Sequence, residues 1–220
     1  MTERSRVSSA HSGRRPQQQR GRERVDAILD AMAVLIAAGG LEGVTMHRLA
    51  REAKTSIGSL YHFFPDQDSV LLALAQRHAA AMDAITLRLR EIERGTWLEA
   101  GADDVARRLV ADYVDYLQRH PDFFPVMAGR FFPQNEAGFV GLMTDVLAVR
   151  LTAASPESRH RYAGMVHTLV LGGVHMAFLS GSTALEVFIA EIPRVLSAYL
   201  ASLERLYVID RGIPHVSDPG

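Results

Sequence analysis

Apolar residues recur along most of the chain at intervals of three and four, which is the spacing of one face of an α-helix. No segment alternates apolar and polar residues over the length of a strand. The pattern therefore predicts an all-α fold. The first apolar stripe ends at Gly39-Gly40, where glycine commonly terminates a helix. It consists of Val25, Ile28, Leu29, Met32, Leu35 and Ile36.

Two short helices are expected next. Thr45 is placed to cap a helix that reaches about Ala53, and Ser56 to cap a second one that Pro65 stops. Residues 45–64 therefore have the size and punctuation of a helix-turn-helix, whose second helix enters the DNA major groove. Any small three-helix unit is punctuated in this way, so the pattern alone leaves simple packing open.

Longer helices make up the remainder. Asp66 is expected to cap a helix that ends near Gly95, with Trp97 in the loop after it. Ser155-Pro156 opens a helix that reaches about Ser180, and a capping box from Thr183 to Glu186 opens the last one. We expect a disordered basic arm over residues 1–20, an N-terminal helical domain over 21–66, a larger helical domain over 67–210 and a flexible tail over 211–220.

Composition narrows the class of protein. The sequence has no cysteine, which excludes disulfides, zinc–thiolate sites and cysteine nucleophiles. The N-terminus carries arginines without the apolar segment of a secretory signal. The most apolar stretch, residues 168–179, is shorter than the ~20 residues of a membrane-spanning helix. We therefore expect a cytoplasmic protein with no membrane partner.

Charge is distributed unevenly along the chain. Residues 1–64 carry ten Lys and Arg against six Asp and Glu, a net charge of +4, and the remainder carries −5. A basic N-terminal part followed by an acidic remainder indicates that the N-terminal part binds a polyanion. Arginine-rich tails that are merely solvated give the same signal.

The sequence lacks the usual enzyme motifs. It contains no H-E-x-x-H, no G-x-S-x-G and no G-x-G-x-x-G, and Lys54-Thr55 lacks the glycines of a P-loop. We therefore expect no catalytic residue, no metal and no cofactor. The alternative is a helical small-molecule-binding protein or an enzyme without a DNA role, and retention on DNA separates it from a regulator.

A specific pattern lies within residues 45–64, at Thr45, Leu49, Ala50, Ala53, Ser56, Gly58, Leu60, Tyr61 and Phe64. With the glycines and Val44 upstream, residues 22–75 resemble the N-terminal signature of the TetR family of bacterial transcriptional regulators, roughly T-x-x-x-[IL]-A-x-x-A-G-V-S-x-G-x-[LI]-Y-x-[HY]-F. Lys54 and Thr55 replace the usual Gly-Val, so the turn cannot depend on glycine at positive φ. Gln67 replaces a frequent lysine.

The resemblance implies a DNA-binding regulator, most often a repressor, that binds a palindromic operator. It assigns Thr45 and Tyr61 to the phosphate backbone, which positions a protein on DNA without reading sequence. Arg20, Arg22 and Arg24 are expected either to enter a flanking minor groove or to remain solvated. The full set of expected DNA-binding residues is Thr45, His47, Lys54, Thr55, Ser56, Ile57, Gly58, Ser59, Tyr61, His62 and Gln67.

The resemblance also implies a small-molecule effector in the larger domain and a homodimer through the last two helices, about residues 156–206. Gly172-Gly173 would let a partner helix approach closely, and Leu196 is expected on the dimer face. The abundance of aromatic and flexible side chains suits a mainly apolar effector. The candidate pocket residues are Trp97, Tyr113, Tyr116, Phe124, Met127, Arg130, Phe131, Met143, His167 and Met176.

Overall fold

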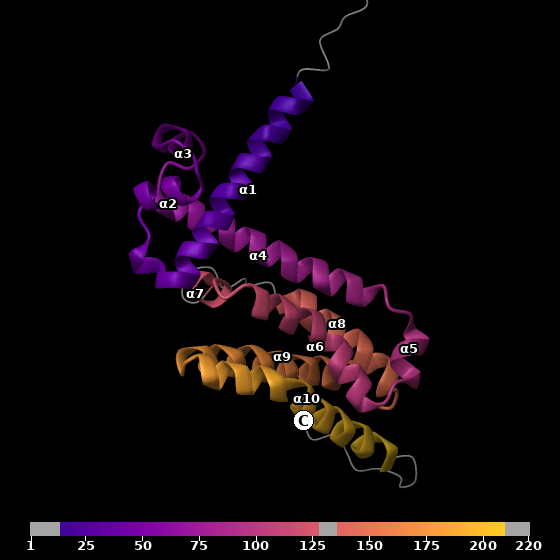
Figure 1. Ribbon diagram of the computed structural model, residues 1–220. Helices are drawn as coiled ribbons and strands as arrows, with labels where there is room; N and C mark the ends of the chain where they lie inside the picture. The colour runs from indigo at the N-terminus through magenta and orange to yellow at the C-terminus, as the bar shows by residue number, and fades with distance from the viewer. Residues whose placement is uncertain (1–13, 128–135, 210–220) are drawn as a thin grey trace, which may run out of the picture. The chain divides into compact units, whose positions relative to one another are not determined.

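The computed structural model describes residues 14–127 and 136–209, and every regular element in these ranges is a helix (Figure 1). The predicted all-α fold is confirmed. The chain divides into two compact units, Met1–Arg77 and His78–Gly220. The first unit includes the start of the helix that follows residue 66, and the domain boundary expected at residue 66 stays a prediction. The expected tail over 211–220 lies outside the described residues.

The first unit is built from short helices and the start of a long one. It comprises α1 (Arg14–Gly39), the 3-10 helix η1 (Leu41–Gly43), α2 (Met46–Glu52), α3 (Ile57–Phe63) and the first part of α4 (Gln67–Arg90). α2 packs against both α1 and α3. The predicted apolar stripes meet in its core, where the fully buried side chains include Ile28, Met32, Ile36, Leu49, Leu60 and Leu74.

Side chains cap these helices as expected. The Thr45 hydroxyl accepts a hydrogen bond from the backbone N–H of Arg48 at 3.2 Å, and the Ser56 hydroxyl accepts one from Ser59 at 3.1 Å. The Asp66 carboxylate accepts a bond from the N–H of Ser69 at 2.7 Å. Each cap satisfies a backbone donor that the first turn leaves unpaired.

The first helix begins within the range expected to be a disordered arm. Because α1 begins at Arg14, residues 14–20 are helical, and Arg20, Arg22 and Arg24 lie on a helix rather than on an extended segment. Two features favour the helix. Pro16 lies in the first turn, where its missing N–H costs no bond, and the following glutamines and arginines are good helix formers. Residues 1–13 lie outside the described ranges.

The second unit contains the remainder of α4 together with six further helices of the described chain. They are α5 (Arg94–Glu99), α6 (Ala102–Arg119), α7 (Phe123–Met127), α8 (Glu136–Arg150), α9 (Pro156–Leu179) and α10 (Ser182–Ile209). α10 packs against α6 and α9, and α8 packs against α9 and α5. α9 and α10 lie side by side in Figure 1.

Trp97 does not lie in a loop. α4 ends at Arg90, and Trp97 is a buried residue of the short α5. The side chain of Arg150 holds this helix in place by donating from Nη1 to the carbonyls of Trp97 at 2.5 Å and Ala100 at 2.7 Å. Its Nε donates to Glu204 at 2.5 Å. One buried guanidinium thus joins α5, α8 and α10.

The expectation about membrane spans also changes. The apolar stretch 168–179 belongs to α9, which has 24 residues and is long and apolar enough to cross a membrane by length and composition. The core helix of a soluble protein meets the same criterion, so one such helix is weak evidence for a membrane. The expectation of no membrane partner stays a prediction.

Candidate functional site

The turn between α2 and α3 has a residue at positive φ although its sequence has no glycine there. Lys54 has φ of 50°, the left-handed region that glycine enters without strain. The turn is closed by the N–H of Thr55, which donates to the carbonyl of Ala50 at 2.9 Å. The turn therefore reaches positive φ without a glycine, with a lysine in that conformation.

Most of the predicted DNA-binding residues lie at the surface of the first unit. Tyr61 has 48% of its side chain exposed. Seven of the predicted positions are exposed, and three others are half-buried. The exposed ones are Thr45, His47, Lys54, Ser56, Gly58, Tyr61 and His62, and the half-buried ones are Ile57, Ser59 and Gln67.

Thr55 is the remaining residue of the predicted set. Its hydroxyl oxygen is buried and has no hydrogen-bond partner among the described atoms. The closing bond of the turn holds the residue inward. Thr55 is therefore half-buried, like Ile57, Ser59 and Gln67, and its expected place at a base edge stays a prediction.

Arg24 joins the exposed face through α1. Its Nη1 donates to the hydroxyl of Ser59 at 3.1 Å. The arginine therefore lies against α3, whereas the sequence left open whether it enters a flanking minor groove or stays solvated. Arg24 and Ser59 are 35 positions apart in the sequence. The contact could have been expected only if α1 had been predicted to include Arg24.

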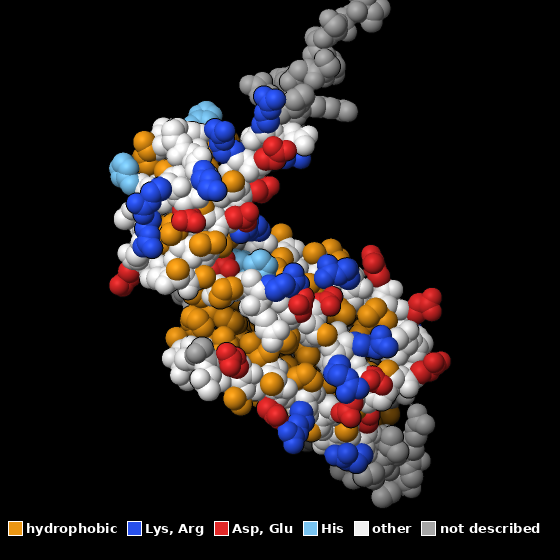
Figure 2. All heavy atoms as spheres, viewed as in Figure 1, with side chains coloured by type: hydrophobic (Ala, Val, Ile, Leu, Met, Phe, Trp, Pro, Cys, Tyr) orange, Lys and Arg blue, Asp and Glu red, His pale blue; other side chains and the backbone are white. Residues whose placement is uncertain are grey.

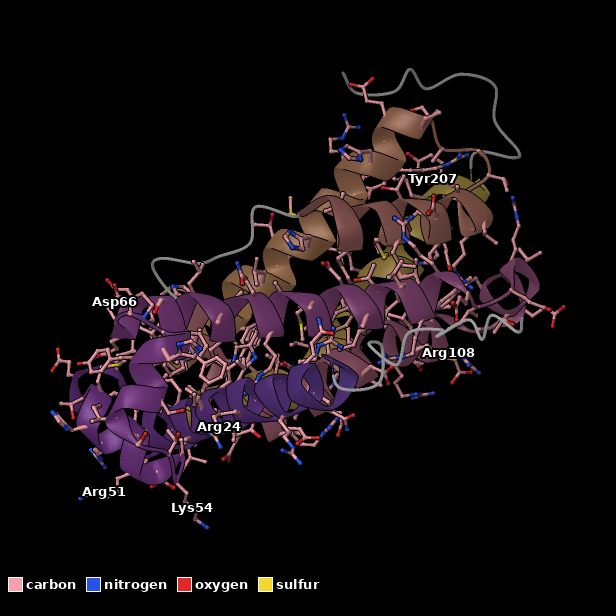
Figure 3. The ribbon with its side chains drawn as sticks, turned by 90° about the horizontal axis from the view of Figure 1, so that it is seen from above. Arg24, Arg51, Lys54, Asp66, Arg108 and Tyr207 are labelled. Carbon is pink, nitrogen blue, oxygen red and sulfur yellow. The ribbon has the colours of Figure 1, made fainter. Side chains whose placement is uncertain are left out.

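Basic side chains lie on the surface of this unit. Figure 2 shows Lys, Arg and His side chains on its visible face, with Asp and Glu side chains among them. In Figure 3 the side chains of Arg51 and Lys54 point away from the helices. Both residues are exposed, and so are His47 and His62. A surface of this kind is suited to a polyanion.

The second unit contains a mainly apolar cavity of about 190 Å³. Four of the predicted pocket residues line it, namely Tyr113, Phe124, Met127 and His167. The ring of Phe139 packs edge-on against Tyr113, with centroids 5.7 Å apart, and tilted against His167 at 5.9 Å. The residues that the sequence did not single out are Ala79, Met82, Asp83, Thr86, Val110, Val114, Leu117, Phe123, Gly138, Phe139, Val170, Leu171, Val174 and Ile192.

The other pocket candidates lie elsewhere. Trp97 is buried in α5, and Met143 is buried in the core between α6, α9 and α10. Met176 has 61% of its side chain exposed and therefore does not line the cavity. Tyr116 belongs to a separate polar cluster. Arg130 and Phe131 lie outside the described residues.

A pair of hydroxyls forms a polar wall of the cavity. The hydroxyl of Thr86 donates to the carbonyl of Met82 at 3.0 Å, and the oxygens of Thr86 and Tyr113 are 2.7 Å apart. Burial raises the pKa of Tyr113, with a further contribution from the charge of Asp83, against the lowering effect of the Thr86 bond. The Tyr113 phenol is therefore neutral at physiological pH.

A buried histidine organises the region before α7. The Nδ1 atom of His78 lies 2.7 Å from the Tyr116 hydroxyl, and its Nε2 lies 3.0 Å from Oδ2 of Asp122. Burial alone would raise the pKa of Asp122, but the hydrogen bond and charge of His78 outweigh it, and the pKa is lowered. His120 stacks on Tyr116 with ring centroids 4.1 Å apart. The cluster fixes the residue that immediately precedes α7.

α9 and α10 present large apolar side chains to the surface of the second unit. On α9 they recur at intervals of three and four, with Gly172 completing the row. A side chain at Gly172 would meet no neighbouring atom within 4 Å, whereas one at Gly173 would overlap the ring of Phe188. Only Gly172 is therefore open to a partner. The exposed apolar residues are Met165, Leu169, Met176, Leu179, Val187, Val195 and Leu206.

Leu196 does not belong to this surface. Only 5% of its side chain is exposed, and it packs with residues of α6 inside the unit. The expectation that Leu196 lies on the dimer face is corrected, because the turn of α10 that carries it faces the core.

A capped helix-turn-helix with an exposed second helix, on a chain whose other unit holds an apolar cavity, defines a DNA-binding transcriptional regulator. The sequence agrees over both units. Residues 28–74 match the family described as "Bacterial regulatory proteins, tetR family", and residues 103–200 match "Tetracyclin repressor-like, C-terminal domain". The chain belongs to the TetR family, whose members are regulators rather than enzymes.

Named relatives resemble the N-terminal part. The chain is 37% identical over 67 residues to the HTH-type transcriptional repressor KstR of Mycolicibacterium smegmatis, which is 30% of this chain and 33% of that protein. The KstR of Mycobacterium tuberculosis is also 37% identical over 67 residues, 30% of each chain. This chain thus spans about a third of the length of the curated relatives it matches.

Solved structures share the fold. A TetR-family regulator from Streptomyces coelicolor has a TM-score of 0.53 at 23% identity, covering 82% of this chain and 99% of its own. A TetR-family regulator from Mesorhizobium loti has a TM-score of 0.56 at 17% identity, covering 86% of this chain and 98% of its own. At these identities the likeness concerns the fold alone.

Proposed function

We propose that the chain is a transcriptional repressor that binds a palindromic operator as a homodimer and is released by a small, mainly apolar molecule. The observation that carries the proposal is the exposed α3 behind a tight turn, with Lys54 beside it and Arg24 against it. The repressor names of the relatives support the direction of regulation. A regulator of bacterial operators acts in the cytoplasm, where the DNA lies.

The exposed side chains differ in which part of the DNA their chemistry suits. Tyr61 and the hydroxyl of Thr45 are suited to phosphate, since both are exposed and keep a proton to donate. Lys54 and Arg24 add positive charge beside them. His47, Ser59 and His62 are the candidates for base edges.

A gel shift with the operator, found by selecting bound genomic DNA, tests the DNA role. Tyr61→Ala should lose operator binding and keep its fold, because the side chain is half exposed and contributes little to the core. Tyr61→Phe isolates the hydroxyl, and Val34→Ala provides a matched exposed control on α1. A chain that binds no genomic fragment, or a Tyr61→Ala variant with wild-type affinity, would contradict this role.

The exposed stripe on α9 is suited to a second copy of the chain. Met165, Leu169, Met176 and Leu179 follow a heptad-like spacing, and Gly172 in their midst admits a close helix. A dimer also supplies the two recognition helices that a palindrome requires, about 34–36 Å or a multiple apart.

Sedimentation of charge variants tests the dimer. Leu169→Glu should give a folded monomer that no longer binds the operator specifically, because its charge would be buried against the partner. Leu98→Glu, on exposed α5, is the matched control and should remain dimeric. A dimeric Leu169→Glu protein would require a different interface.

The cavity is the proposed effector site. Its walls come from α4, α6, α7, α8, α9 and α10, and α4 continues without a break into the first unit. A ligand that binds here can release DNA only by its difference in affinity for two states, and tenfold release corresponds to about 1.4 kcal/mol. Titration of the effector with and without operator should therefore show reciprocal weakening. Equal affinities would contradict the coupling.

A further inference from the structure

We propose that the cavity of the second unit selects neutral molecules that carry a hydrogen-bond donor, such as a phenol or an alcohol on an apolar body, and rejects carboxylates. This inference rests on the proposed role of the cavity as the effector site. The proposal rests on the Thr86–Tyr113 pair, because both hydroxyl protons of the pair are used in hydrogen bonds to other atoms of the protein.

The direction of the protons follows from the geometry. A threonine hydroxyl has one proton, and that of Thr86 points to the carbonyl of Met82 at 3.0 Å. The oxygen of Thr86 then accepts the proton of Tyr113 across 2.7 Å. The phenol oxygen of Tyr113 keeps its acceptor capacity and has no proton left to offer. A ligand at this wall therefore gains a hydrogen bond only if it donates one.

Burial makes this preference effective. Thr86 is only 7% exposed, and Tyr113 is half-buried with Phe139 packed against its ring. Burial also keeps Tyr113 protonated, because it raises the pKa of the phenol. A polar ligand group left unpaired in such a place loses its hydration without compensation.

The charge of the lining disfavours anions. Asp83 lines the cavity and lies near enough to Tyr113 to affect its ionisation. Among the lining residues that the structure describes there is no lysine or arginine. Arg88 lies nearby, but its guanidinium is 3.2 Å from Asp112 and it does not line the cavity. A carboxylate would thus enter beside the exposed carboxylate of Asp83, and His167 is the one titratable group that lines the cavity besides Asp83 and Tyr113 among the described residues.

Size limits the ligand as well. A cavity of about 150 Å³ lined by apolar side chains is known to accept benzene. The cavity here has about 190 Å³ and therefore accommodates one ring with a short substituent. Four probes of this size differ in a single group. They are p-cresol, a donor; toluene, apolar; p-tolualdehyde, an acceptor only; and p-toluate, an anion.

Calorimetric titration of the full-length protein with these probes tests the inference. We expect p-cresol to bind tightest and p-toluate not to bind. Tyr113→Phe should weaken p-cresol by about tenfold and leave toluene unchanged, so toluene also reports that the cavity is intact. Tyr162→Phe is the matched control, because it removes a hydroxyl paired with Tyr207 away from the cavity.

Thr86→Val reverses the preference. Without the threonine oxygen, the proton of Tyr113 is free to donate, so p-tolualdehyde should gain about threefold to tenfold while toluene is unchanged. Asp83→Asn should admit p-toluate.

Three results would overturn the inference: binding of p-toluate to the wild-type protein, equal affinities of p-cresol and p-tolualdehyde, or no binding of any probe. A gel shift on the same preparations keeps the two proposals separate. A protein that binds operator and none of the probes contradicts only the ligand class. One that binds p-cresol and no DNA contradicts only the regulator.

Discussion

Lys54 combines a strained backbone conformation with a positive charge that favours DNA binding. Substitutions at this position can separate the two effects. Its φ of 50° places an L-residue in the left-handed region, which costs roughly 1–2 kcal/mol. Glycine removes this strain but gains about 0.5–1 kcal/mol of conformational entropy in the unfolded chain. Lys54→Gly should therefore stabilise the protein by about 0.5–1 kcal/mol, or raise Tm by about 2–3 °C.

The same substitution should weaken operator binding. Lys54 is exposed at the turn before α3, and its ammonium is available to a phosphate. Loss of one phosphate contact in each subunit should reduce the slope of log K against log salt by about 1.8 for the dimer. Stability and DNA affinity should thus change in opposite directions.

Two further variants assign each effect. Lys54→Ala removes the charge and keeps the strain, so its stability should stay near the wild-type value while its salt slope falls. Lys54→Arg keeps both, so neither should change. Thermal unfolding of the Lys54 variants measures their stability, and gel shifts at several salt concentrations measure the salt dependence of operator binding. The reasoning fails if the glycine and alanine variants are equally stable, or if alanine leaves the salt slope unchanged.

Three other predictions concern the second unit. Arg150→Met should cost about 2–4 kcal/mol in urea denaturation, because two carbonyls and a carboxylate lose their donor. Asp122, whose pKa is lowered by His78, contributes stability that is present above its ordinary pKa and lost as the pH falls through the lowered one. The free energy of unfolding of the wild-type protein should therefore exceed that of Asp122→Asn by less below about pH 4 than above it. A difference that does not depend on pH would contradict this prediction. Gly173→Ala should destabilise by about 1–3 kcal/mol, since its Cβ overlaps the ring of Phe188, and wild-type stability would show that the ring moves freely.

Four helix caps were predictable from the sequence, whereas the capping box expected to open the last helix at Thr183 lies inside α10, which begins at Ser182. The caps at Thr45, Ser56, Asp66 and Ser155 form within three residues, so residue type and spacing are sufficient to indicate them. The apolar stripes predicted the helices for the same reason, since a helix repeats every 3.6 residues. The helix-turn-helix is contained in one such local stretch and was therefore recognisable.

Only the tertiary structure decided which face of a helix meets a neighbour and which remains open. Leu196 and Met176 are equally apolar, yet one is buried and the other exposed, because distant helices cover the first alone. Thr86 and Tyr113 are 27 positions apart, and packing of α4 against α6 creates their pair. Lys54 shows the strongest case: the local rule assigns glycine to its conformation, and the hydrogen bonds of the folded turn impose that conformation on a lysine.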